Sequence, residues 1–489
     1  MMRFTVRRRL DTITPQVRSL FGLVAGRSKT KQIPLDEPMS LGFPIAKAKG
    51  ETTPIVSEAK VTKLSNGVRV ISTNSILPGA SVGIMFAGGS RHAPKPGMPH
   101  ILASLALQSS ATRSEASSMR GLEELGGQFS AEANRDNIII RADIMPSDLN
   151  AAIEIITDIV KNGSFDVGEV SHRVESYRHQ VSEVLSQNAT LLMEDALHNA
   201  AFAGKGLGLP IHAWTEDQAK ALNSAAELKE FHDATFRPES IVVVGAGIDH
   251  EQLAKQAEEC LGGFKAQGSA ANPGISPYVG AEYRNNAPSS DGFAHFGLGF
   301  ACGGWQNKDV VPACALAMLM GGGGSFSAGG PGKGMYSRLY QRVLTGNAWV
   351  HSAQCLPSLH ADTTLLSIHG FSDPEDAGEL AKVLVEQAKA MPANLTDEEV
   401  SRAKNQLKSS LYMNLENRHV LFEDLGQQIL NYGKRIEPKE LAAQIDSLSV
   451  KDIRSVAEKL LSKPATVVVK GDIGYQIPEQ STIVDQLKK

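Results

Sequence analysis

The chain has 489 residues, of which 42% are hydrophobic and 21% are charged, a composition typical of a folded protein of two to four domains. It contains no apolar run near the eighteen residues that a membrane helix needs. Its formal net charge is −4, but residues 1–31 hold eight basic residues and one acid, so the rest of the chain is distinctly acidic.

This basic, acid-poor leader predicts a mitochondrial transit peptide at 1–33, followed by an N-terminal extension at 34–60. A nucleic-acid-binding arm is the alternative, but phosphate binding would need a basic face on the folded part, and that part is acidic. We therefore expect no nucleic-acid partner.

The cysteines are scattered along the chain and show no CxxC spacing. We expect buried free thiols in a reducing compartment, and no zinc site built from them. The four positions are Cys260, Cys302, Cys314 and Cys355.

A weak internal repeat divides the chain into two halves. SVGIMFAGG at 81–89 resembles HFGLGFACG at 295–303, with Phe86 matching Phe300. Each half closes on a β-branched run that predicts a buried strand, at 240–248 and at 465–473. Long helical patterns lie between these strands, at 166–185 and at 396–415, and the second starts with a capping box. The pattern predicts two α+β halves, 61–265 and 291–489, joined by a linker at 266–290.

The second half contains a glycine-rich segment, GGGGSFSAGGPGKG, at 321–334. Helical patterns at 310–320 and 335–344 flank it, so it interrupts what resembles one helical hairpin. A flexible linker is one interpretation; a mobile loop that contacts an extended ligand is the other, and we favour it. The expected substrate-binding residues are Gly321, Gly322, Gly323, Gly324, Ser325, Phe326, Ser327, Gly329, Gly330, Gly332, Lys333 and Gly334.

Other catalytic motifs fail on their spacing. A P-loop needs Ser or Thr after its Gly-Lys pair, whereas Lys333 is followed by Gly334. IVVVGAG at 241–247 has only two glycines of a dinucleotide fingerprint and fits a strand-ending turn better. No GxSxG elbow is present.

The glycine-rich string, followed by SRLY at 337–340, resembles the alpha subunits of the mitochondrial processing peptidases, a non-catalytic branch of the pitrilysin-type peptidase family. The resemblance covers roughly residues 34–475. It continues in PLDEP at 34–38, KLSNGVRV at 63–70, ELGG at 124–127, MNLENR at 413–418 and EDLGQQIL at 423–430. It implies two tandem homologous α/β-sandwich domains that enclose a cavity.

Catalytic members of this family carry an HxxEH zinc motif on a helix, with a further Glu about 75 residues later. In this chain His100 remains, whereas Ala103 stands in place of the base and Ser104 in place of the second ligand. Gln180 lies where the third ligand is expected. We expect no catalysis by this chain, no metal or other cofactor in it, and His100 as a structural histidine.

The resemblance implies a recognition role: the chain binds presequences of imported precursors and presents them to the zinc site of a partner beta subunit. Carboxylates would attract these basic peptides, and Glu416, Glu423 and Asp424 are the weaker candidates for such contacts, with a solvated helix face as their alternative. The alternative function is a core subunit of respiratory complex III, and one protein can fill both roles. Either role places the chain in the mitochondrial matrix or on the matrix side of the inner membrane.

Overall fold

The computed structural model describes residues 58–75, 78–106, 108–265, 275–324, 335–473 and 476–488, with backbone alone at 184–187. All of them belong to one compact unit, Ile55–Lys489. The expected transit peptide and all but the last three residues of the expected extension lie outside this description.

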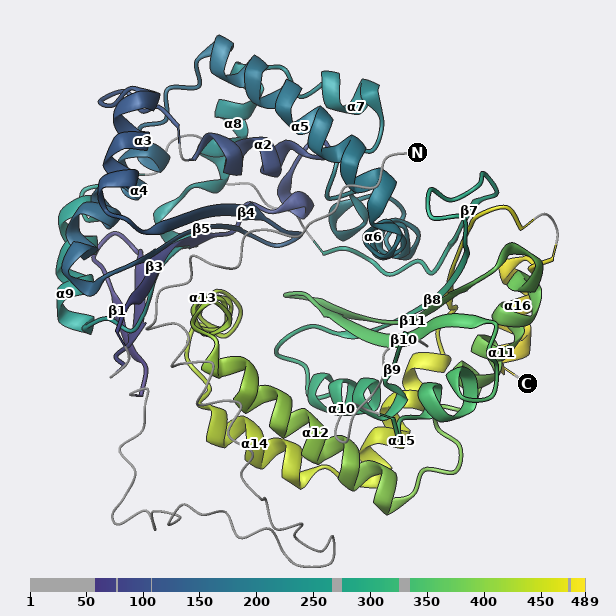
Figure 1. Ribbon diagram of the computed structural model, residues 1–489. Helices are drawn as coiled ribbons and strands as arrows, with labels where there is room; N and C mark the ends of the chain where they lie inside the picture. The colour runs from purple at the N-terminus through teal and green to yellow at the C-terminus, as the bar shows by residue number, and fades with distance from the viewer. Residues whose placement is uncertain are drawn as a thin grey trace, which may run out of the picture. The chain divides into compact units, whose positions relative to one another are not determined.

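The first half forms one sheet and its helices (Figure 1). The strands are β1 (Lys60–Lys63), β2 (Arg69–Thr73), β3 (Ala80–Phe86), β4 (Gln128–Ala133), β5 (Ile138–Ile144) and β6 (Ile241–Ala246). The α-helices are α2 (Met98–Leu105), α3 (Glu115–Glu124), α4 (Leu149–Lys161), α5 (Val167–Gln187), α6 (Ala189–Ala201), α7 (Glu216–Lys220), α8 (Ala225–Thr235) and α9 (His250–Leu261). Short 3-10 turns are η1 (Ser90–His92), η2 (Pro146–Asp148), η3 (Gly206–Gly208) and η4 (Pro238–Ser240).

The second half repeats this plan. Its strands are β7 (Glu282–Asn285), β8 (Ala294–Gly303), β9 (Gly322–Gly324), β10 (Val350–Leu359), β11 (Thr363–Ser372) and β12 (Thr466–Lys470). Its helices are α10 (Val310–Met320), α11 (Ala377–Lys389), α12 (Asp397–Glu416), α13 (Arg418–Tyr432), α14 (Pro438–Ser447), α15 (Val450–Leu461) and α16 (Gln480–Lys488), with a π-helical turn η5 (Tyr340–Leu344) and a 3-10 turn η6 (Pro374–Asp376).

Sheet topology shows that the two halves are copies of one design. The strand orders are β1-β2-β6-β3-β5-β4 and β7-β12-β8-β11-β10-β9. The parallel pair β2–β6 corresponds to β7–β12, and β3, β5 and β4 correspond to β8, β11 and β10. Each sheet has one added edge strand, β1 in the first half and β9 in the second. The predicted α+β duplication, with β3, β6, β8 and β12 at the expected positions, is therefore confirmed.

Each sheet is covered on one face by helices of its own half and on the other by a helix of the opposite half. Leu421, Phe422 and Leu425 of α13 pack on Ile71 and Met85 of the first sheet. Reciprocally, α6 of the first half lies on the second sheet, where its apolar residues meet β11 and β12 (Figure 1). The two halves thus exchange one helix each.

Three local expectations differ from the structure. The expected linker at 266–290 contains β7, because parallel pairing with β12 draws Glu282–Asn285 into the second sheet. The expected helix at 335–344 is reduced to a short turn around η5. The free cysteines include one buried thiol, Cys355, whereas Cys260, Cys302 and Cys314 are partly exposed. No helix in the described ranges combines the length and apolarity needed to cross a membrane.

Candidate functional site

The degenerate zinc motif lies on α2, which packs against α5. The helix starts after Gly97, whose φ of +80° suits glycine, and a Cβ there would lie 2.6 Å from the Tyr177 hydroxyl of α5. Ala103 is buried, and the Ser104 hydroxyl donates a 2.7 Å hydrogen bond to the Ile101 carbonyl of its own helix. Gln180 of α5 is exposed.

His100 is part of an aromatic stack. Its ring lies parallel to that of His212 with centroids 4.1 Å apart, and Trp214 meets His212 edge-on at 4.9 Å. Tyr177 completes the group, its hydroxyl 3.2 Å from His212 Nδ1. Burial, followed by the neighbouring His212, lowers the pKa of His100 to about 3, and burial also lowers the pKa of His212. Both rings are therefore neutral near pH 7.

These residues do not fit a zinc ion. One imidazole remains where the motif supplies two, the Ser104 hydroxyl is turned to its own helix, and Gln180 carries no charge. Across the described residues, no three His, Cys, Asp or Glu side chains are grouped so that they could hold a metal ion. An aromatic stack occupies the place of a metal centre, and no hydrolytic step can be assigned to it.

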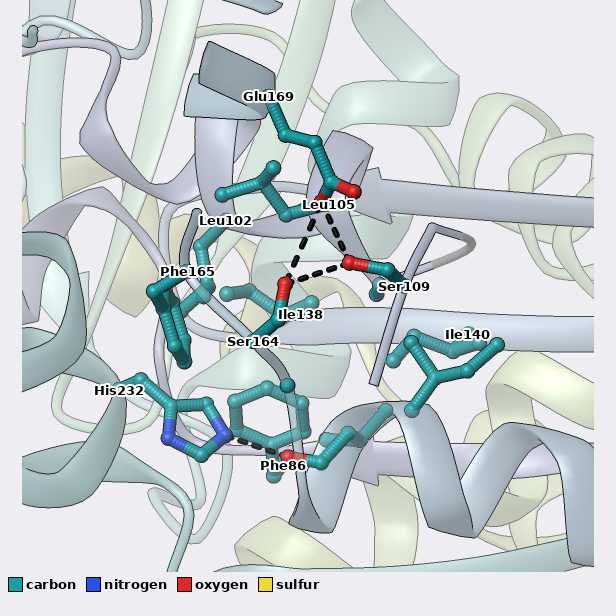
Figure 2. A pocket seen from close by; sticks show the side chains of 14 residues that line it. Phe86, Leu102, Leu105, Ser109, Ile138, Ile140, Ser164, Phe165, Glu169 and His232 are labelled. Atoms are coloured by element: carbon teal, nitrogen blue, oxygen red, sulfur yellow. Dashed lines mark hydrogen bonds between the residues drawn. The ribbon is translucent and has the colours of Figure 1, made fainter. Parts of the chain in front are cut away.

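A small cavity under α2 also lacks catalytic geometry (Figure 2). Its free volume of ≈ 20 Å³ holds about one water molecule. Ser109 donates a 2.6 Å hydrogen bond to Glu169, and Ser164 joins the same pair. His232 lies on the other side of the cavity and donates from Nε2 to the Val160 carbonyl at 2.7 Å. Its ring nitrogen is thus committed to backbone, so this set is not a nucleophile with its base.

The glycine-rich segment is built into the second sheet at its start. Gly322–Gly324 form the edge strand β9, with Gly324 opposite Ser352 and Gly322 opposite Gln354 of β10. Gly322 has a φ of +104°, and a Cβ there would lie 2.0 Å from the Ala353 carbonyl oxygen, so only glycine fits. Gly322–Gly324, which were predicted as part of the loop, therefore lie in a strand. Residues 325–334, with Ser325, Phe326, Ser327, Gly329, Gly330, Gly332, Lys333 and Gly334, lie outside the described residues.

Ser337 and Arg338, which follow the segment in the chain, hold its far end in place. The Ser337 hydroxyl accepts a 3.1 Å hydrogen bond from the Gly322 amide and so ties exit to entry. Arg338 is buried; it forms a bidentate pair with Glu399, at 3.0 and 2.9 Å, and donates to the carbonyls of Ala390 and Ala393. Both flanks of the segment are therefore fixed in the second half, the first by β9 and the second by Ser337 and Arg338.

A groove of ≈ 510 Å³ adjoins this exit, between α10 and α12. Its apolar lining is rich in methionine, a flexible side chain that adapts to differently shaped partners. Met335 and Tyr336, at the exit of the segment, line it, and Met413 lies toward the end of α12. The volume is in the range of sites that hold several side chains of a ligand.

The three candidate carboxylates differ in availability. Glu416 is exposed at the end of α12. Glu423 lies 3.6 Å from Arg141; burial, then Glu132, raises its pKa. Asp424 already accepts hydrogen bonds from Arg435 and Gln428. Asp424 thus stabilises the fold, and Glu416 is the carboxylate best placed to meet a ligand.

Two features of this region were not predicted from the sequence. His212 lies 112 positions from His100 in the chain, and no motif signals that the rings stack. Arg338 could have been noted, because a charged residue in an apolar helical pattern calls for a buried partner, but Glu399 is identified only by the fold.

Comparison with known proteins agrees with this architecture. Residues 69–213 match the model of the insulinase family, peptidase family M16, and residues 224–407 match that of the peptidase M16 inactive domain. Among solved structures, "Complex III2 from Candida albicans, Inz-5 bound" contains a chain that aligns with a TM-score of 0.74 at 20% identity, over 88% of this chain and 99% of that one. At this identity the likeness concerns the fold alone.

Two similar proteins place the chain more narrowly within this family. The mitochondrial-processing peptidase subunit alpha of Solanum tuberosum is 35% identical over 93% of this chain and 90% of its own length. The subunit alpha of Homo sapiens is 32% identical over 85% of this chain and 82% of its own length. The chain therefore belongs to peptidase family M16 and, within it, to the alpha subunits of the mitochondrial processing peptidases.

Proposed function

We propose that this chain is the non-catalytic, substrate-binding subunit of a heterodimeric mitochondrial processing peptidase. In that complex a beta subunit supplies the zinc ion and the general base, and this chain binds the presequences of imported precursors. The observation that carries the proposal is that both flanks of the glycine-rich segment are anchored, by β9 before it and by Ser337 and Arg338 after it. The positions of the zinc motif in the other half hold Ala103, Ser104 and Gln180 instead of a base and ligands. We place this activity in the mitochondrial matrix, or on the matrix side of the inner membrane.

The proposed role requires this chain to bind the presequence but not to cleave it. A presequence must lie extended for its backbone to be cleaved, and a glycine-rich chain can follow a variable peptide closely because it lacks side chains. The methionine-lined groove beside the segment would receive apolar side chains. Glu416 would attract the basic side chains of the presequence.

The decisive experiment replaces residues 325–334 by a short Gly-Ser turn and leaves β9 and Ser337 intact. The variant is assembled with its beta subunit, and cleavage of presequence peptides is measured. We expect normal assembly with a raised KM or a reduced kcat, because the peptide loses part of its binding surface. Lys333→Ala serves as the matched control and should change cleavage little. Unchanged kinetics in a correctly assembled complex would rule out the recognition role.

A core subunit of respiratory complex III is the second candidate. The structural likeness to a chain of the Candida albicans complex is what favours it, and that likeness concerns fold only. Affinity purification of the tagged chain from its mitochondria separates the two functions. Copurification with cytochromes supports the core role, a two-subunit complex with a zinc-bearing partner supports processing, and recovery of both supports a shared subunit.

A further inference from the structure

Four aromatic rings gather on the second sheet where β8 begins and β11 ends. The centroid of the Phe371 ring lies 5.2 Å from that of Phe293 and 5.2 Å from that of His295. The His351 ring, at the start of β10, lies 4.8 Å from Phe293 and 6.1 Å from Phe371. His295 is buried, whereas the other three residues are partly exposed. We call these four residues the aromatic patch.

Strand pairing places the rings on one face of the sheet. Phe371 of β11 and His295 of β8 are direct cross-strand partners, so their side chains point to the same side. The pairing of β10 with β11 shifts register at His351, which brings its ring to the same group. This is the face on which α6 packs, because Gly297, two residues after His295, meets side chains of α6.

The patch is not part of a hydrophobic core. Ala294 and Phe296, on either side of His295, belong to the core on the opposite face of the sheet. Among the described residues, neither Phe293 nor Phe371 belongs to a hydrophobic cluster or packs against one. Core packing therefore does not account for these two phenylalanines, which leave part of their surface open to a ligand.

The patch lies close to the start of the glycine-rich segment. Phe371 is paired with Ser352 of β10, and Ser352 is paired with Gly324, the last residue of β9. Neighbouring strands are about 5 Å apart, so the backbones of Phe371 and Gly324 are separated by roughly 10 Å. A Cβ at Gly324 would meet only the His351 carbonyl oxygen, at 3.9 Å, so the described residues leave space there. A peptide that contacts this end of β9 would therefore be within reach of the patch.

Two carboxylates flank the rings, and they differ in availability. Asp291 lies 2.9 Å from His295 Nε2 and already has a basic neighbour, Lys470, which is opposite His295 on β12. Asp373, directly after β11, lies 3.4 Å from His351 Nε2, and its side chain is 51% exposed. Asp373 is therefore the carboxylate that can meet an incoming positive charge.

We propose that the aromatic patch, together with Asp373, is a subsite for one arginine side chain of the bound peptide, an inference that rests on the proposed peptide-binding role. A guanidinium is planar, so it can lie on a phenylalanine ring and donate to a carboxylate at the same time. A lysine ammonium is compact and strongly hydrated, and it would gain less from the rings. The patch would thus select a basic side chain, whereas the methionine-lined groove would receive apolar ones.

Peptide binding to the full chain, measured by fluorescence anisotropy, tests this subsite. Three labelled peptides are compared: the sequence of residues 1–31, the same sequence with every arginine replaced by lysine, and the same with every arginine replaced by citrulline. Citrulline keeps the shape of arginine and removes its charge. Phe371→Leu keeps an apolar side chain but removes the aromatic face. It should weaken binding of the arginine peptide by about threefold to tenfold, the lysine peptide by less, and the citrulline peptide not at all.

A second variant does not depend on the packing of the rings. Asp373→Asn changes a half-exposed side chain, and it should weaken binding of the arginine peptide by roughly twofold to fivefold without affecting the citrulline peptide. Phe264→Leu, at a partly exposed phenylalanine that follows α9, is the matched control. It should leave the affinities for all three peptides unchanged.

The outcomes separate this subsite from the proposed function. If the wild-type chain binds the arginine peptide and neither Phe371→Leu nor Asp373→Asn weakens that binding, the subsite is wrong and the peptide-binding role stands. Equal losses for the arginine and citrulline peptides in both variants would also overturn it, because the effect would not depend on the guanidinium charge. If the wild-type chain binds none of the three peptides, the subsite and the peptide-binding role are both wrong.

Discussion

Met85 on β3 of the first half lies directly against Gly426 on α13 of the second. A Cβ at residue 426 would come within 2.7 Å of the Met85 methyl group and within 3.2 Å of Val244. The corresponding contact on the other sheet has the roles reversed: Gly297 on β8 faces Met193 of α6, where a Cβ would lie 3.2 Å from the methyl group. In both places a missing side chain lets an exchanged helix approach its sheet.

Gly426→Ala tests this close approach. Alanine normally stabilises a helix relative to glycine by roughly 1 kcal/mol. Here we expect the opposite, a loss of about 1–3 kcal/mol in the free energy of unfolding, because the methyl group overpacks against Met85. Urea unfolding measures it. Gly121→Ala in α3, which meets only the flexible end of Ile155 at 3.2 Å, is the control and should be neutral or stabilising.

Arg338→Lys should be costly although it keeps the charge. Lysine cannot form the bidentate pair with Glu399 and also reach the carbonyls of Ala390 and Ala393. We expect a loss of roughly 3 kcal/mol in unfolding free energy. The half-exposed neighbour Arg342, 3.7 Å from Glu399, offers the matched control. If Arg342→Lys and Arg338→Lys lowered the free energy of unfolding equally, the bidentate pair of Arg338 with Glu399 would not be the contact that stabilises this region.

The aromatic stack predicts loss of stability in acid. The folded-state pKa of His100 is lowered to about 3, so the unfolded chain binds the proton first as the pH falls below roughly 6.5. Stability linked to this group is therefore complete above that pH and declines toward pH 3, by up to about 1.4 kcal/mol per pH unit. His100→Phe should flatten this decline in unfolding experiments at pH 7.0, 5.5 and 4.5. Replacing the exposed His179 by Phe should leave it unchanged.

Zinc should not bind stoichiometrically to the chain on its own. Ala103, Ser104 and Gln180 supply neither a base nor an anionic ligand. Equilibrium dialysis followed by metal analysis measures this directly, and cleavage assays without any partner accompany it. About one zinc per chain, together with activity of the isolated chain, would contradict the proposed function.

Binding of basic peptides should weaken with salt if carboxylates attract them. Charge pairs near a surface are screened as the Debye length shortens from about 30 Å at 0.01 M to about 8 Å at 0.15 M ionic strength. Anisotropy of a labelled peptide with the sequence of residues 1–31 would report the affinity. Glu416→Gln should reduce the salt dependence, while Asp424→Asn should act mainly on stability. An affinity independent of salt would indicate apolar recognition through the groove.

Much of the fold could be predicted because its signals are local. The β-branched runs at 241–244 and 466–469 form buried strands, and Thr396 with Glu399 caps α12 as expected. The lost zinc motif was equally visible, since it depends on residue identity at fixed spacing. These predictions needed no knowledge of distant neighbours.

The rest depends on contacts between remote segments. An apolar helix face does not reveal which sheet will cover it, so the exchange of α6 and α13 was not predictable. Glycine has little preference for strands, and β9 exists because β10 offers it an edge. The stack of His100 on His212 likewise depends on how the chain closes in space.

The reciprocal exchange of α6 and α13 has a consequence for how the chain can be divided into fragments. A fragment that ends near residue 265 would keep α6 without its sheet, and would uncover Ile71, Met85, Val242 and Val244 on its own. The first and second halves are thus arranged like the partners of a domain-swapped dimer, in which each completes the other. The chain is therefore the covalent form of a twofold assembly, and cutting it between the halves should leave two pieces that stay together.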